Sequence, residues 1–173
     1  MGKVGDSAFK YWEFDVHEAV DGILFVFHDD DIESNGVMIP VKTLHYQQIK
    51  ESGQKMGIEI PTLAEVIDIL KNRPEPTMIE IKNLLTDQAR QRIINTASGR
   101  PDWKLMASLT RFQKSFPKKT RKHWHSEIQK ADTKLVRVRA HDVDLFRATR
   151  TWLTLSFNRL KWKFGFWFPK SLG

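Results

Sequence analysis

Two short apolar segments near the start of the chain predict a β-hairpin. YWEFDV (11–16) and ILFVFH (23–28) are rich in aromatic and β-branched residues, which favour strands. Asp21-Gly22 lies between them, and this pair favours a two-residue type I′ turn because both central residues need a positive φ. Such a turn sets Asp15 opposite His28, and directly opposite side chains share a face. One face is then apolar apart from Glu18, and the other carries Glu13, Asp15, His28 and Asp30.

Helical and strand patterns alternate along the rest of the chain. Residues 31–60 contain Asn35-Gly36 and scattered glycines, which predict an irregular excursion with a short helix near 43–52. IPTLAEVIDILKN predicts a helix with Thr62 as its N-cap and Glu65 completing a capping box. The later elements are expected to be strands at 77–82, 105–109 and 135–140 and helices at about 86–98 and 118–131. This alternation is typical of a parallel α/β sheet.

The strand at 77–82 adds a third carboxylate to the hairpin pair. Its alternation places Glu80 and Lys82 on one face, opposite to Ile79 and Ile81. Ligands bind at the carboxyl ends of parallel strands, so Glu80 is expected to join Glu13 and Asp15 there. Carboxylate oxygens suit Ca²⁺ or Mg²⁺, and a histidine beside the cation can transfer a proton near neutral pH.

Each of these signals also has an ordinary structural explanation. A Glu-x-Asp pair on a strand usually faces solvent, and Lys82 can simply pair with Glu80 or Asp15. A single histidine is more often structural than catalytic. We assign that structural role to His17, His45, His123, His125 and His141.

Composition limits the function without choosing it. With 173 residues and 40% hydrophobic content, the chain is long enough for one globular domain. The absence of cysteine excludes disulfides and thiolate chemistry. No apolar run is long enough for a membrane span, and the first ten residues do not resemble a signal peptide, so a cytoplasmic location is expected.

The ordered set of motifs resembles the glycerophosphodiester phosphodiesterases. WEFDVHEAVDGILFVFHDDDI is similar to their signature, in which Glu-x-Asp on a strand precedes an Asp-Gly turn, an apolar strand and a His-Asp pair. IPTLAEVIDIL followed by MIEIK is similar to the helix that starts with Ile-Pro-Thr-Leu and the Glu-x-Lys strand of the family. The resemblance covers residues 8–82 and is weak after about residue 110.

The resemblance implies a fold, a site and a reaction. The family fold is a TIM-barrel (β/α)₈ with its site at the C-terminal face. By resemblance, Glu13, Asp15 and Glu80 ligate Ca²⁺ or Mg²⁺, His28 is one of two catalytic histidines, and Lys82 contacts the phosphate. The implied reaction is hydrolysis of a small glycerophosphodiester to an alcohol and glycerol 3-phosphate.

One part of the family pattern has no counterpart here. Family members begin with a strand that ends in His-Arg-Gly, and nothing before Tyr11 matches it. We therefore expect residues 1–173 to form a single partial phosphodiesterase domain with an incomplete barrel, and do not expect full activity. This domain would include the excursion at 31–60 and a basic aromatic tail at 151–173.

The charge distribution supports a different hypothesis. The net charge is +7, and residues 103–173 hold 17 Lys/Arg against 4 Asp/Glu. This half is either a solvated basic face or a surface for phosphate-rich partners. The alternative function is thus a non-catalytic protein that binds nucleic acid or anionic membrane through this half. Specific nucleic-acid recognition is not expected, a membrane contact would be weak, and the sequence does not predict the oligomeric state.

Overall fold

The computed structural model describes residues 11–131 and 133–136 of the chain. Its elements in chain order are β1 (Trp12–Glu18), β2 (Leu24–Val26), β3 (Asp31–Ser34), β4 (Val37–Pro40), the 3₁₀ turn η1 (Val41–Thr43), α1 (Tyr46–Lys55), α2 (Leu63–Leu70), β5 (Thr77–Asn83), α3 (Asp87–Ser98), β6 (Trp103–Met106), α4 (Leu109–Ser115), α5 (Arg121–Lys130) and β7 (Lys134–Val136). The elements from 62 to 136 largely follow the predicted order, but α4 was not predicted.

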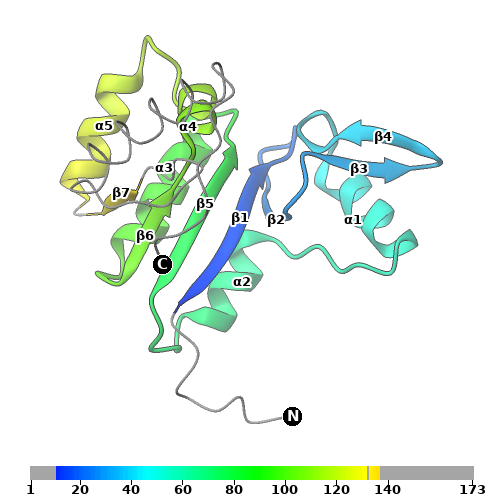
Figure 1. Ribbon diagram of the computed structural model, residues 1–173, viewed down its shortest axis with the longest axis horizontal. Coiled ribbons are helices and arrows are strands. Elements are labelled where there is room, and N and C mark those ends of the chain that lie inside the picture. Colours follow the sequence, from blue (N-terminus) through cyan, green and yellow to red (C-terminus); the bar gives the residue numbers. More distant parts are fainter. Residues whose placement is uncertain (1–10, 132, 137–173) are drawn as a thin grey trace, which may run out of the picture. The chain divides into compact units, whose positions relative to one another are not determined.

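The main sheet is open and mostly parallel. Its strand order is β2-β1-β5-β6-β7 (Figure 1). The pairs β1–β5, β5–β6 and β6–β7 are parallel, and β2 runs antiparallel to the end of β1. The parallel α/β fold expected from the sequence is therefore confirmed.

Strand alternation separates the core from the site face, as predicted for β5. Thr77, Ile79 and Ile81 are buried, whereas Met78, Glu80 and Lys82 are only partly buried. The buried side of the sheet packs against side chains of α2, α3, α4 and α5 in one apolar cluster. Burying this face fixes the register of the strands, because a shift by one residue would turn the isoleucines away from the core.

The helix starts follow the predicted capping chemistry. Thr62 Oγ1 accepts from the backbone N of Glu65 at 3.2 Å, and the Glu65 carboxylate accepts from the backbone N of Thr62 at 2.7 Å. This reciprocal pair is the capping box expected for α2. Thr86 caps α3 through its hydroxyl alone, with Oγ1 accepting from the backbone N of Ala89 at 3.1 Å.

The predicted register of the first hairpin is wrong by one residue. β1 and β2 pair with His17 opposite Phe25, so that Asp15 lies opposite Phe27 rather than His28. The Phe27 backbone N donates to Asp15 O at 3.1 Å. The loop holds three residues, Val20 to Gly22, and only its glycine has a positive φ (78°). A three-residue loop with a left-handed glycine replaces the type I′ turn, which requires two residues with positive φ.

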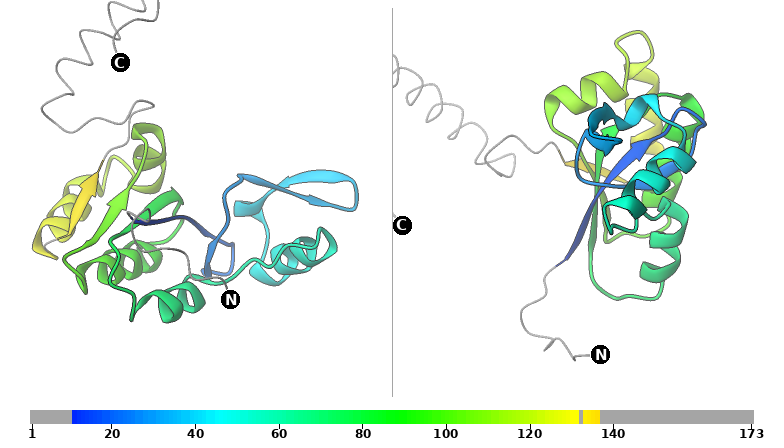
Figure 2. Two further views of the ribbon diagram at one scale, coloured as in Figure 1. Left: turned by 60° about the horizontal axis from the view of Figure 1, so that its bottom comes forward. Right: turned by 90° about the vertical axis from the view of Figure 1, so that its right-hand side faces the viewer.

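The segment 31–60 is more regular than predicted. Asn35 and Gly36, with φ of 53° and 79°, form the tight turn between β3 and β4. This Asn-Gly pair is a hairpin signal that the prediction of an irregular excursion did not use. The short helix expected near 43–52 is confirmed as α1. Figure 2 shows β3, β4 and α1 on the β1–β2 side of the sheet, away from β6 and β7.

Two predictions near the C-terminus concern residues that the structure describes only in part or not at all. The strand expected at 135–140 is described as β7 up to Val136, and the tail at 151–173 lies outside the described residues. Among the described helices, none has the length and apolar character needed to cross a membrane.

Glu18 links the end of β1 to the start of α3. Its side chain is fully buried and accepts hydrogen bonds from the backbone N of Leu85 and, at 2.9 Å, from that of Thr86. It also accepts from Thr86 Oγ1 at 2.6 Å. The carboxylate thereby satisfies two backbone donors that enter α3, which holds the loop after β5 against β1.

We expect Glu18→Ala to lower the free energy of unfolding by about 3 kcal/mol, because buried amides lose their acceptor. Glu18→Gln keeps an acceptor oxygen and should cost less than half as much. Urea denaturation measures both, with Glu33→Ala on the exposed side of β3 as the control. A cost for Glu18→Ala no larger than that of the control would contradict the structural role of Glu18.

Candidate metal centre between β1 and β5

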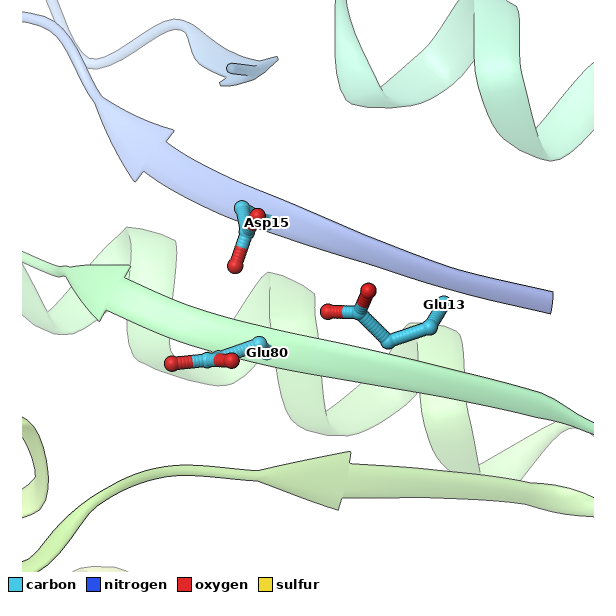
Figure 3. Close-up of side chains that lie close together, drawn as sticks. All are labelled: Glu13, Asp15 and Glu80. Carbon is cyan, nitrogen blue, oxygen red and sulfur yellow. The ribbon is translucent and has the colours of Figure 1, made fainter. Parts of the chain in front are cut away.

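Parallel pairing of β1 and β5 brings three carboxylates together. Asp15 pairs with Glu80 in the register of the two strands, and Glu13 precedes Asp15 by two residues on the same face. One oxygen from each of the three lies within 4.8 Å of the others. Figure 3 shows the three side chains converging from the two neighbouring strands. The three residues that the sequence grouped therefore lie together, and their role as metal ligands stays a prediction.

Lys82 contributes a positive charge to this cluster. Its Nζ lies 3.0 Å from Asp15 Oδ1 and 3.5 Å from Glu80 Oε1. Burial lowers the pKa of Lys82, but its bond to Asp15 and the charges of both carboxylates outweigh burial and raise the pKa overall. Lys82 is therefore a firmly protonated ammonium that pairs with Asp15 and Glu80, one of the two alternatives that the sequence left open.

The cluster has the donor set of a site for a hard cation. Burial, followed by the charges of Asp15 and Glu80, raises the pKa of Glu13. Three carboxylates face one ammonium, so negative charge remains in excess. Closely spaced carboxylate oxygens with excess negative charge fit Ca²⁺ or Mg²⁺, which prefer oxygen ligands.

His28 lies at the edge of this cluster on an exposed segment. Its Nδ1 is 2.7 Å from Asp29 Oδ1. The pKa of His28 is raised, first by this hydrogen bond and then by the charge of Asp15. An ionised carboxylate can only accept, so Nδ1 carries the proton and Nε2 is left as the exchanging nitrogen. The catalytic role of His28 stays a prediction.

Arg111 approaches the site although sequence reasoning did not assign it there. Arg111 Nη2 donates to Asp30 Oδ2 at 2.5 Å, and this contact joins residues 81 positions apart. No local sequence pattern signals such a pair. The prediction that Asp30 faces the same way as Glu13 gave no partner for it.

His17 is buried beside the site and stacks on Phe25, with ring centroids 5.6 Å apart. Burial lowers the pKa of His17 to about 4, so its ring is neutral at physiological pH. Its burial in the packed interior agrees with the structural role that the sequence indicated.

Comparison with known proteins matches the sequence of this chain to a protein family. The model of the glycerophosphoryl diester phosphodiesterase family matches residues 6–99. No curated protein matches the chain.

Solved structures with similar folds carry the same family description. A glycerophosphodiester phosphodiesterase from Agrobacterium tumefaciens is 22% identical, with 61% of this chain and 49% of that chain covered and a TM-score of 0.46. A protein from Galdieria sulphuraria assigned as a glycerophosphodiester phosphodiesterase is 13% identical, with 84% and 60% covered and a TM-score of 0.56. A glycerophosphoryl diester phosphodiesterase domain of an uncharacterized Mycobacterium tuberculosis protein is 11% identical, with 87% and 55% covered and a TM-score of 0.54.

The likeness to the Galdieria sulphuraria and Mycobacterium tuberculosis structures, whose TM-scores exceed 0.5, concerns the fold alone at these identities. The chain spans 49%, 60% and 55% of the lengths of the three solved chains, which is less than two thirds in each case.

The raised pKa of Glu13 has a consequence for stability. Because the folded-state pKa exceeds the unfolded one, ionised Glu13 opposes folding at neutral pH and stops doing so once acid protonates it. Glu13→Gln should therefore stabilise the cation-free protein at pH 7, by at most about 0.5 kcal/mol because water screens this exposed group. The gain should vanish below about pH 4.

Thermal unfolding in the presence of a chelator measures this difference at both pH values. Glu33→Gln on β3 is the matched control, because it removes the same charge away from the cluster. Equal stability changes for the two variants at pH 7 would show that repulsion in the cluster is negligible.

Proposed function

The chain belongs to the glycerophosphoryl diester phosphodiesterase family, and we propose that it hydrolyses glycerophosphodiesters with the help of a divalent cation. The observation that supports this most strongly is the group of Glu13, Asp15 and Glu80, whose oxygens approach within 4.8 Å on the face of β1 and β5 opposite the apolar core. These three residues would hold Ca²⁺ or Mg²⁺. The products would be an alcohol and glycerol 3-phosphate.

The residues around the cation have separate roles in the proposed reaction. A bound divalent cation supplies Lewis acidity that offsets negative charge on phosphoryl oxygens. When the substrate binds, the Lys82 ammonium gives up all or part of its ion pairs with Asp15 and Glu80. It then binds one phosphate oxygen as a point charge. It lies close enough to Asp15 and Glu80 to act beside the same cation.

His28 is the proposed proton carrier. Its raised pKa and its bond to Asp29 keep a protonated ring available near neutral pH. As water forms the new bond to phosphorus and the bond to the alcohol breaks, the alcohol oxygen takes up the proton that Nε2 of His28 gives, and the proton lost by water restores the ring. Asp29 holds the opposite side of the ring and so sets its orientation.

The open sheet would be one section of a barrel wall. We propose that β1, β5, β6 and β7, which are successive parallel strands, belong to a (β/α)₈ barrel that is incomplete in this chain. Residues 1–173 would then be one partial domain. A cytoplasmic location and a small-molecule substrate are separate parts of the proposal.

The non-catalytic alternative has less support. It relies on the basic C-terminal half, and residues 137–173 lie outside the described part of the chain. Binding to anionic vesicles or nucleic acid with a steep salt dependence would favour this alternative.

We expect release of glycerol 3-phosphate from glycerophosphocholine in the presence of Ca²⁺ or Mg²⁺, and its loss on chelation. Glu80→Gln should reduce kcat/KM by about 100-fold, equivalent to about 3 kcal/mol of transition-state stabilisation. Glu33→Gln on β3 should leave the rate unchanged, since this residue is exposed and outside the carboxylate cluster. The proposal fails if neither cation supports hydrolysis, or if Glu80→Gln hydrolyses as fast as the control.

A further inference from the structure

Arg111 lies at the start of α4, where the chain leaves the carboxyl end of β6. Ser108 caps this helix, with its Oγ accepting from the Arg111 backbone N at 3.3 Å. The side chain extends to Asp30, which lies two residues after His28. Arg111 is therefore placed at the same end of the sheet as the proposed cation and proton carrier.

The Arg111 guanidinium interacts electrostatically with the carboxylate cluster as well as with Asp30. Its pKa is raised, first by the hydrogen bond to Asp30, and the charges of Glu80 and Asp15 act in the same direction. The same hydrogen bond lowers the pKa of Asp30, so both partners are ionised at neutral pH.

Among the residues that the structure describes, Arg111 uses little of its hydrogen-bonding capacity. A guanidinium has five N–H donors, and within the described residues one side-chain bond is found for it, from Nη2 to Asp30. The Arg111 side chain is 27% exposed and that of Asp30 is 50% exposed, so solvent reaches both. Remaining donors are thus available to an anion that enters beside the cluster.

Lys82 is a weaker candidate for the main anion contact. Its side chain is 12% exposed, and its ammonium lies against two carboxylates, those of Asp15 and Glu80. Arg111 faces a single, half-exposed carboxylate, which an incoming anion can replace at lower cost. The planar fork of Arg111 also matches two phosphate oxygens at once, which a lysine cannot do.

We propose that Arg111 is a substrate-positioning residue whose guanidinium binds the phosphate oxygens of the glycerophosphodiester, with Asp30 holding it in place in the free protein. This inference rests on the proposed function for its substrate class. A purely structural role is the competing explanation, in which the Arg111–Asp30 pair only fastens α4 to the segment that carries His28.

The two explanations predict different effects for the two partners. If the pair is only a fastener, Arg111→Ala and Asp30→Asn break it equally and weaken ligand binding alike. If Arg111 binds phosphate, Arg111→Ala removes the donor, whereas Asp30→Asn frees it. The contrast between these variants is therefore informative even where both lose some stability.

The test is calorimetric binding of sn-glycerol 3-phosphate to the full chain saturated with Ca²⁺. Arg111→Ala should weaken binding by about 10-fold to 100-fold, the worth of one charge-assisted contact. Asp30→Asn should bind at least as tightly as the wild type. Lys114→Ala, an exposed residue on the same helix, removes the same charge and should stay within about twofold of the wild type.

Ca²⁺ affinity and hydrolysis are measured on the same variants. Arg111→Ala should retain Ca²⁺ binding, because removing a nearby positive charge does not weaken a cation site, and this result separates a lost contact from unfolding. The inference is overturned if Arg111→Ala binds the ligand like the wild type, if it weakens together with Asp30→Asn, or if the wild type binds no glycerol 3-phosphate. If no variant and not even the wild type hydrolyses the substrate, but the variants show the expected contrast in binding, the proposed activity is rejected and the anion site is retained.

Discussion

The parallel pairing of β1 with β5 is the constraint on which the site depends. It sets Asp15 beside Glu80, while Val16 and Ile81, their neighbours in the same register, are buried on the opposite face. Since successive side chains alternate between faces, the packing that holds the apolar residues in place also fixes the carboxylates. The like charges gathered in this way oppose folding, and Lys82 offsets part of that cost.

Polar contacts, some buried and some reached by solvent, extend this constraint to the loops that follow the strands. Glu18 holds the loop that enters α3, and Arg90 ties that loop to α4 by donating to Leu84 O at 3.2 Å and to Ser115 O at 2.5 Å. Asp30 and Arg111 fasten the segment after His28 to the first turn of α4. Residues that approach the site therefore come from loops and helix starts supported by a packed sheet, an arrangement suited to holding a ligand.

Local patterns in the sequence predicted more of this structure than long-range ones did. Strand alternation correctly put Glu13 and Asp15 on one face of their strand and Glu80 on one face of the other, and the parallel register that pairs Asp15 with Glu80 brings the three together within the strands rather than at their ends. The register of the first hairpin was wrong, because Asp21-Gly22 also fits a loop in which only the glycine is left-handed. The contact of Asp30 with Arg111 could not be predicted, since tertiary packing alone joins residues so distant in the chain.

The central claim is that Glu13, Asp15 and Glu80 form a site for a divalent cation. A crystal structure of the protein with Mn²⁺, located by its anomalous scattering, tests this most directly. The account predicts one ion bound by an oxygen from each of the three carboxylates, with metal–oxygen distances of about 2.0–2.6 Å and with Lys82 displaced from Asp15. An ion bound elsewhere, with Lys82 still paired to Asp15 and Glu80, would contradict it.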